Sequence, residues 1–139
     1  MASTYIQLSS KKFPILPGEE DELTNEGTWG KALAEYLLEH LNKIGYQAAF
    51  VCCEDWGWWV ELKGAPFALG VCVYCNPEQA APTNFVCTDG VTASRKWSWR
   101  QFRFLDTTAW SDRLNKDLIK IFEADEEIEI LCVSGELPF

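Results

Sequence analysis

The chain has 139 residues, of which 47% are aliphatic, aromatic or cysteine and 24% are charged, so it can bury one hydrophobic core and does not have the composition of a disordered protein. Its 21 acidic and 12 basic residues give a formal net charge of −9, which disfavours binding to nucleic acid or to an anionic membrane. No segment approaches the ~20 apolar residues of a membrane helix, and the N-terminus lacks the pattern of a secretory signal. We therefore expect one cytoplasmic domain over residues 1–139.

The N-terminal third of the chain predicts a strand, a connection and a helix. Residues 5–8 alternate weakly, as in a short edge strand, and the proline-containing, acidic residues 13–22 predict a surface connection. Apolar residues then recur at helical spacing from about residue 29 to residue 44. Thr28 is the predicted N-cap of this helix, and Gly45 supplies a left-handed stop.

The middle of the chain predicts strands joined by turns. Residues 47–53 predict one strand, residues 54–55 a turn, and residues 56–62 a second strand whose even-numbered positions share one face, as in a hairpin with one buried side. In residues 67–75 both the odd-numbered and the even-numbered positions are apolar or small, which is typical of a central strand covered on both faces. Gly70 in that strand indicates a bulge or a close backbone approach.

The C-terminal part predicts a further strand at residues 85–87, a strand-like segment, a second amphipathic helix and a closing strand. In residues 95–105 two tryptophans and two phenylalanines lie on opposite parities, and a bulge near residues 100–101 would bring all four rings to one face. The helix is expected to begin after Asp106 or Thr107 and to end near Asp125, before a strand over residues 127–133. The inward-facing residues of that strand are expected to be Ile128, Ile130 and Cys132.

The order of these elements indicates the fold class. Several strands follow one another through short turns, which favours an antiparallel or mixed sheet over the alternating pattern of a parallel one. The two amphipathic helices each need a surface on which to bury their apolar face. The sequence therefore predicts a single α+β domain of two layers, with both helices packed on a mostly antiparallel or mixed sheet.

Two adjacent carboxylates, Glu54 and Asp55, lie beside Trp56, Trp58 and Trp59. Glycoside cleavage needs paired carboxylates, and sugars stack on aromatic rings. Adjacent residues of a strand point to opposite sides, however, and such a pair more often occupies a turn while the tryptophans fill the core. We therefore assign no catalytic residue and treat these five residues as candidate binding residues.

Four of the twelve basic residues fall within nine positions, interleaved with aromatic residues. Such a segment can present an anion-binding or partner-binding surface, because arginine and tryptophan are favoured at interface hot spots. The alternative is an ordinary strand whose exposed basic side chains pair with acidic neighbours. The candidate binding residues of this segment are Trp97, Trp99, Arg100 and Arg103.

The cysteines and the single histidine offer little chemistry. Cys72 and Cys75 have the spacing of half a zinc knuckle or of a redox pair, and Cys52 and Cys53 could complete four thiolates. Residues 70–75 look extended, which would send the first two thiols to opposite faces, and cysteines in apolar strands usually pack as small core residues. His40 is too isolated for a triad or a histidine-based metal site. We predict no metal and no cofactor.

The segment Glu54-Asp55-Trp56-Gly57-Trp58 and an upstream stretch, Gly30-Lys31-Ala32-Leu33-Ala34-Glu35-Tyr36-Leu37, carry a resemblance. The chain is similar to a family of small, uncharacterised bacterial proteins that have a Glu-Asp-Trp-Gly-Trp signature after a Gly-x-x-Leu-Ala-x-x-Leu-type helix. The resemblance extends to the later helix and the closing strand. It implies no activity and assigns no catalytic residue.

We expect a non-enzymatic binding or protein-interaction domain that recognises a protein partner through aromatic and acidic surfaces, and an immunity-like protein that blocks a toxin is one concrete version. The alternative is a small ligand-binding protein or enzyme with a tryptophan-lined pocket, in which Glu54, Asp55 or Glu61 supplies polar contacts. A homodimer also stays open, because seven tryptophans in 139 residues leave enough aromatic surface for an interface.

Overall fold

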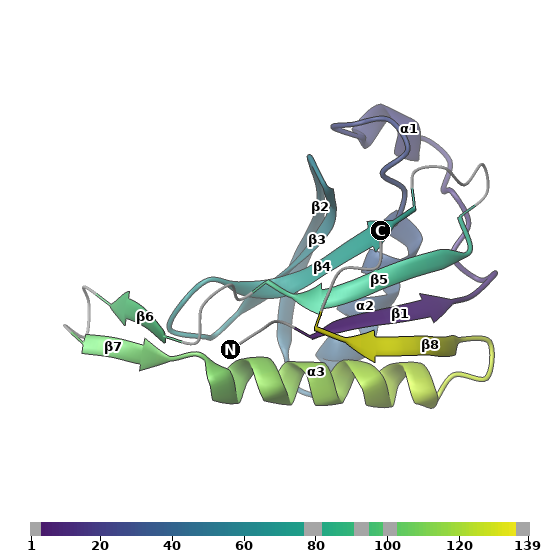
Figure 1. Ribbon diagram of the computed structural model, residues 1–139. Helices are drawn as coiled ribbons and strands as arrows, with labels where there is room; N and C mark the ends of the chain where they lie inside the picture. Colours follow the sequence, from purple (N-terminus) through teal and green to yellow (C-terminus); the bar gives the residue numbers. More distant parts are fainter. Residues whose placement is uncertain (1–3, 77–81, 91–94, 99–102, 136–139) are drawn as a thin grey trace.

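The structure, a computed structural model, describes residues 4–76, 82–90, 95–98 and 103–135 (Figure 1). No helix within these ranges is long and apolar enough to cross a membrane. In chain order the elements are β1 (Tyr5–Ser9), α1 (Glu19–Glu22), α2 (Lys31–Lys43), β2 (Gln47–Glu54), β3 (Gly57–Lys63), β4 (Leu69–Cys75), β5 (Asn84–Asp89), β6 (Arg95–Ser98), β7 (Arg103–Asp106), α3 (Thr108–Glu123) and β8 (Glu129–Ser134).

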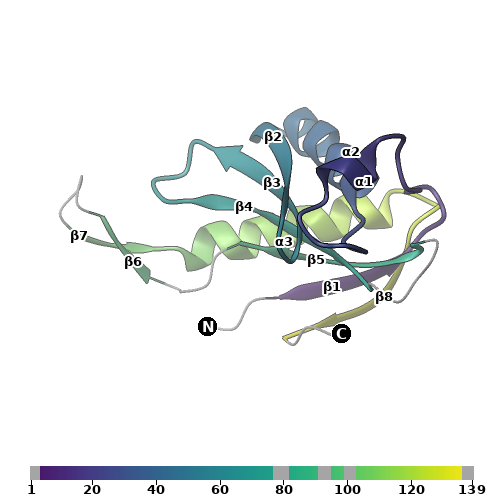
Figure 2. The same ribbon diagram turned by 90° about the horizontal axis from the view of Figure 1, so that it is seen from above.

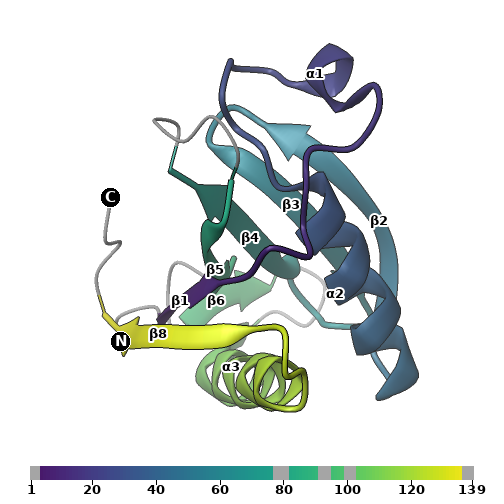
Figure 3. The same cartoon turned by 90° about the vertical axis from the view of Figure 1, so that its right-hand side faces the viewer.

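Six strands form one antiparallel sheet in the order β2-β3-β4-β5-β1-β8, and β6 and β7 pair as a separate ribbon. Helix α2 packs on β2 and β3, and α3 packs on β5 and β8 (Figure 3). Both helices share one hydrophobic core with the strands, so they cover the same face of the sheet. The ribbon extends beyond the sheet, in line with α3 (Figures 1 and 2). The predicted two-layer α+β fold is confirmed.

Helix α2 buries one stripe of apolar residues, as its spacing predicts: Leu33, Ala34, Leu37 and Leu41. Gly45 follows with a φ of 102°, which confirms the predicted left-handed stop. The Asn42 side chain then fixes the start of β2, because its amide accepts from the Ala48 N–H at 2.9 Å and donates to the Ala48 carbonyl at 3.0 Å.

The start of α2 differs from the prediction. Thr28 is not its cap, since the Thr28 hydroxyl donates to the Asn25 carbonyl and the helix begins at Lys31. The N–H groups of Gly30 and Lys31 instead donate to the Glu19 carboxylate at 3.0 and 3.2 Å. The prediction was wrong because the capping group lies outside the local sequence of the helix.

The acidic segment before α2 is also more structured than a surface connection. It contains the one-turn helix α1, and Glu19 at its start is fully buried. The second carboxylate oxygen of Glu19 accepts from the Leu16 N–H at 3.0 Å. Three backbone donors thus hold this carboxylate, which explains how a charged group is tolerated in the core.

Strand β1 is not the edge strand that its weak alternation predicts. It lies between β5 and β8, and Ile6 pairs with Cys87 on one side and with Val133 on the other. Strands β2 and β8 form the edges of the sheet. Alternation within one segment cannot reveal its neighbours, because both partners come from much later in the chain.

The buried side of the β2–β3 hairpin is the predicted one, with Trp58, Val60 and Leu62 in the core. Gly70 in β4 marks a close backbone approach, as predicted, because a Cβ there would lie 2.5 Å from the Val60 carbonyl oxygen. A Cβ at Gly70 would lie 2.2 Å from the Trp59 ring, which crosses the face of the sheet opposite the helices.

The C-terminal elements follow the predicted order with two differences. Helix α3 begins after Thr107, as expected, but Cys132 in β8 is exposed rather than inward, because the pairing of β8 with β1 shifts register at an irregularity. Residues 95–98 and 103–106 form two paired strands instead of one continuous segment. The bulge expected at residues 100–101 lies outside the described residues.

Candidate functional site

The residues of the pentapeptide signature divide between turn and core. Asp55 and Trp56 connect β2 to β3 and are exposed. Gly57 packs against β4, where a Cβ would lie 2.2 Å from the Val73 carbonyl oxygen. Trp58 is buried in the core, so the second half of the signature has a packing explanation.

The signature and the upstream helix motif meet in space. A Cβ at Gly30 would lie 3.2 Å from Cδ1 of Trp58, so the absence of a side chain there makes room for the indole ring. The ring N–H donates to the Thr28 carbonyl at 3.0 Å, and the Lys31 ammonium lies 5.9 Å from the ring centroid. The two motifs therefore form one packing unit.

The three tryptophans of the signature region do not line one pocket. Trp56 is 38% exposed and contacts Tyr74, with ring centroids 5.2 Å apart. Trp58 lies in the core, whereas Trp59 lies on the opposite face and donates from Nε1 to the Glu61 carboxylate at 2.8 Å. Gly70, which leaves room for the Trp59 ring, is the sequence signal that could have predicted its position.

Two residues of the second candidate set, Trp97 and Arg103, lie on the β6–β7 ribbon, far from α1 (Figure 1). Trp97 pairs with Phe104 and Arg103 with Ser98 in the register of the ribbon. Trp99 and Arg100 fall outside the described residues. The structure therefore does not bring Trp97 and Arg103 together with the candidates at the β2–β3 turn.

One group of exposed carboxylates gathers where α1 meets the β2–β3 turn. The segment after α1 is held against this turn, because the Asn25 side chain donates to the Asp55 carbonyl at 2.7 Å and the Thr24 hydroxyl donates to the Cys53 carbonyl at 3.4 Å. The region is called the acidic surface below, and its carboxylates are Glu20, Asp21, Glu22, Glu26, Glu54 and Asp55.

The acidic surface contains a groove of about 420 Å³. Leu23 and Trp29, both half-buried, give the groove apolar walls, and three carboxylates complete its lining. A basic side chain fits such a lining, because the carboxylates attract its charge and the indole ring contacts its apolar stem. The carboxylates are those of Glu20, Asp21 and Glu26.

A larger cleft of about 870 Å³ lies between α2 and α3. Each helix contributes one stripe at helical spacing, so the two stripes face each other across the opening. From α2 and its end the stripe is Tyr36, His40, Lys43 and Ile44; from α3 and its end it is Arg113, Asp117, Lys120, Ile121 and Ala124. None of the described residues that line the cleft is a tryptophan.

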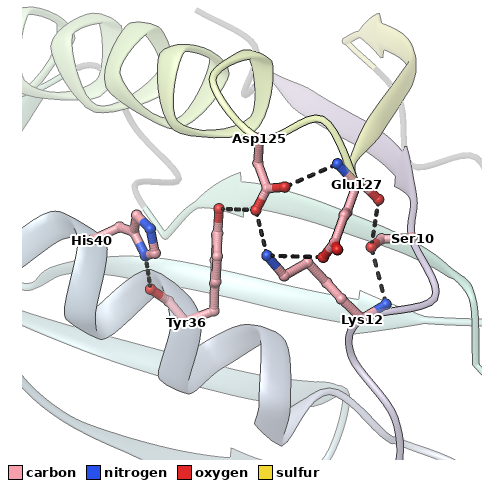
Figure 4. Close-up of polar contacts among 6 residues, drawn as sticks. All are labelled: Ser10, Lys12, Tyr36, His40, Asp125 and Glu127. Atoms are coloured by element: carbon pink, nitrogen blue, oxygen red, sulfur yellow. Dashed lines mark hydrogen bonds and ion pairs between the residues drawn. The ribbon is translucent and has the colours of Figure 1, made fainter.

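Polar contacts close one end of this cleft (Figure 4). Asp125 accepts from the Lys12 ammonium at 2.5 Å, from the Tyr36 hydroxyl at 2.8 Å and from the Glu127 N–H at 2.9 Å. The hydrogen bond from Lys12 is the main reason that the pKa of Asp125 falls to about 2. The same contact raises the pKa of Lys12, and burial raises that of Tyr36.

His40 forms part of the cleft floor. Its ring stacks on Tyr36 with centroids 4.0 Å apart, and its Nδ1 lies 2.9 Å from the Tyr36 carbonyl oxygen (Figure 4). Because a carbonyl oxygen can only accept a hydrogen bond, Nδ1 carries the proton of this contact, and Nε2 takes no part in it. Sequence reasoning did not place His40 in a cleft, because the cleft depends on the position of α3.

The cysteines show no feature of a reactive site. Cys72 and Cys75 lie on the extended strand β4, and burial raises their pKa values to about 12 and about 11. Reactive thiols need a lowered pKa. Within the described part of the chain, no group of three or more His, Cys, Asp or Glu side chains could hold a metal ion.

No protein-family model, curated protein or solved structure matches the chain. The resemblance of the pentapeptide to an uncharacterised bacterial family therefore stays a prediction.

Proposed function

We propose that the protein is a cytoplasmic, non-enzymatic interaction domain that binds a basic protein partner through the acidic surface. The observation that carries this proposal is a groove with apolar walls and three carboxylates, in a segment that is held against the β2–β3 turn and its exposed carboxylates. Charge at such a surface steers a partner of opposite sign, and aromatic residues supply contact area. An arginine or lysine of the partner would occupy the groove next to Trp29.

The charge balance of the region supports this choice. Among the described residues, the ion pair of Lys31 with Glu22 is the one that engages a carboxylate of the acidic surface. Trp56, exposed at the β2–β3 turn, adds an aromatic contact beside Glu54 and Asp55. An immunity-like protein that binds a basic toxin has these properties.

The alternative of a tryptophan-lined pocket with Glu54 and Asp55 fits the geometry less well. Trp58 and Trp59 lie on opposite faces of β3, and both carboxylates are exposed at the turn. A ligand at these acids would meet Trp56 alone of the three rings.

The test compares two triple variants in binding assays with the products of the adjacent genes. Glu20→Gln/Glu26→Gln/Asp55→Asn removes three charges from the acidic surface, and Glu123→Gln/Glu129→Gln/Asp112→Asn removes three exposed charges elsewhere. We expect the first variant to weaken partner binding about tenfold or more near 150 mM salt, with a smaller effect near 500 mM, because salt screens exposed charges.

The matched control should stay within about twofold of the wild type, because its charges lie away from the acidic surface. Equal weakening by the two variants would show that net charge alone drives binding and would overturn the proposal. If no adjacent-gene product binds the wild-type protein, the immunity-like version is excluded.

A further inference from the structure

The α2–α3 cleft is independent of the acidic surface, and its volume of about 870 Å³ lies within the range of roughly 300–1,000 Å³ that is typical of small-molecule sites. We propose that this cleft binds a small organic anion with a planar apolar body, which lies on the Tyr36–His40 stack while its anionic group meets the cations of the mouth. The inference does not depend on the proposed partner.

The floor of the cleft suits a planar body. The rings of Tyr36 and His40 are stacked with an interplanar angle of 30°, and Ile44 and Ile121 add apolar surface. The hydrogen bond from the Tyr36 hydroxyl to Asp125 and the contact of Nδ1 with the helix backbone hold both rings in place. Such a floor is organised before a ligand arrives, which reduces the ordering cost of binding.

The mouth of the cleft carries the cations. Lys43 and Lys120 come from the last turns of the two helices, and Arg113 lies about two turns before Lys120 on α3. The ion pair between Arg113 and Asp117 is long, at 3.9 Å. Lys43 forms an ion pair with Glu39 at 3.3 Å, and both of these side chains are exposed. Among the described residues, no ion pair engages Lys120.

Three of the four acidic residues of the cleft, Asp117, Asp125 and Glu127, are already engaged by the protein. Asp125 and Glu127 share Lys12, and Asp117 accepts from the Tyr46 hydroxyl at 2.6 Å. Lys12 lies between these carboxylates, so it partly neutralises the closed end. Glu126 is exposed in the turn after α3. An anionic group therefore finds its attractive contacts at the open mouth rather than at the closed end.

The test titrates the 15N-labelled protein with indole-3-acetate and with tryptamine, which share a ring system and carry opposite charges. We expect indole-3-acetate to shift the amide signals of residues 36–44 and 113–127 in a saturable way, with a Kd of about 1 mM for a ligand of this size. Tryptamine should bind at least about fivefold more weakly, because the mouth cations repel it.

Two double variants locate the charge. Lys43→Gln/Lys120→Gln should raise the Kd for indole-3-acetate about fivefold or more, whereas Lys63→Gln/Lys116→Gln, an equal charge change at exposed positions outside the cleft, should change it less than about twofold. The amide spectra also show whether each variant is folded.

Three results would overturn the proposal. The first is an absence of saturable shifts at the cleft up to about 10 mM indole-3-acetate, which is about tenfold above the expected Kd. The second is binding of tryptamine as tight as that of indole-3-acetate, which would show that the cleft recognises the ring system and not the negative charge. The third is equal weakening by the two double variants, which would make the attraction non-specific.

Discussion

The two ends of α2 use charged side chains in opposite ways. At its N-terminus the Glu19 carboxylate is fully buried, and three backbone N–H groups donate to it. Further along the helix, Tyr36 donates to Asp125, which also pairs with Lys12 and is partly exposed, and His40 stacks on Tyr36. The buried carboxylate at the N-terminus is committed to the fold, whereas the contacts further along the helix are partly exposed to solvent.

This difference changes the meaning of the pentapeptide signature. Gly57 and Trp58 belong to the buried unit at the N-terminus of α2, where each has a steric explanation. Glu54, Asp55 and Trp56 are exposed and belong to the acidic surface. A distinctive run of residues therefore combines a packing role with a candidate binding role, and mutations can separate the two.

The largest expected effect follows truncation of Trp58. Trp58→Ala should lower the free energy of unfolding by about 3–5 kcal/mol, because it leaves a cavity between Gly30 and Val73. Trp56→Ala in the same signature should cost less than about 1 kcal/mol, since its side chain is exposed. Urea unfolding measures both, and similar losses would contradict the division of the signature into core and surface.

Gly57→Ala should destabilise the protein by about 3 kcal/mol, because its Cβ would clash with the backbone of β4 at Val73. Gly45→Ala is the matched control: its φ of 102° is also unfavourable for alanine, yet nothing lies within 4 Å of the added Cβ. The control should lose only about 1 kcal/mol in the same urea experiment. If the two variants are equally stable, the close approach is not what selects glycine at Gly57.

The sequence predicted those parts of the fold whose signal is local. Helical spacing located α2 and α3, and alternation identified the buried side of β3, because these periods of 3.6 and 2 residues arise within one segment. The predicted edge position of β1 and the predicted cap of α2 were wrong, because both features depend on contacts between residues distant in sequence. Such contacts leave no period to detect.

The candidate sites show the same limit. The exposed carboxylates of residues 54–55 were visible in the sequence, but their meeting with residues 20–26 depends on the contact of Asn25 with Asp55. The stripe of α2 around His40 carries no signal of a cleft in the sequence. Only the placement of α3 makes that stripe one wall of a cleft.

Glu19→Gln tests the buried carboxylate and should cost about 2 kcal/mol of unfolding free energy. Its two oxygens accept from Leu16 on one side and from Gly30 and Lys31 on the other, so an amide would point its own N–H groups at a backbone donor. Glu20→Gln, an exposed neighbour, should change stability by less than about 0.5 kcal/mol. Equal, small effects on the urea midpoint would show that the helix does not need this cap.

The smallest effect is expected further along α2, where Tyr36 contacts Asp125, from Asp125→Asn. The ordinary pKa of 3.8 falls to about 2 in the folded protein, so the ionised carboxylate stabilises the fold above about pH 4. This contribution is lost as the pH falls from about 4 to 2, because the unfolded chain takes up the proton first. It amounts to about 1 kcal/mol, since solvent screens the partly exposed contact with Lys12.

Urea unfolding at pH 7 and near pH 2.5 measures this contribution for the wild type, for Asp125→Asn and for the exposed control Asp112→Asn. The wild type and the control should lose about 1 kcal/mol more stability on acidification than Asp125→Asn does. An identical acid response in all three would place Asp125 among groups that contribute nothing measurable to the fold. A loss at pH 7 as large as that of Glu19→Gln would instead show that both ends of α2 are equally committed to folding, and the contrast between them would fail.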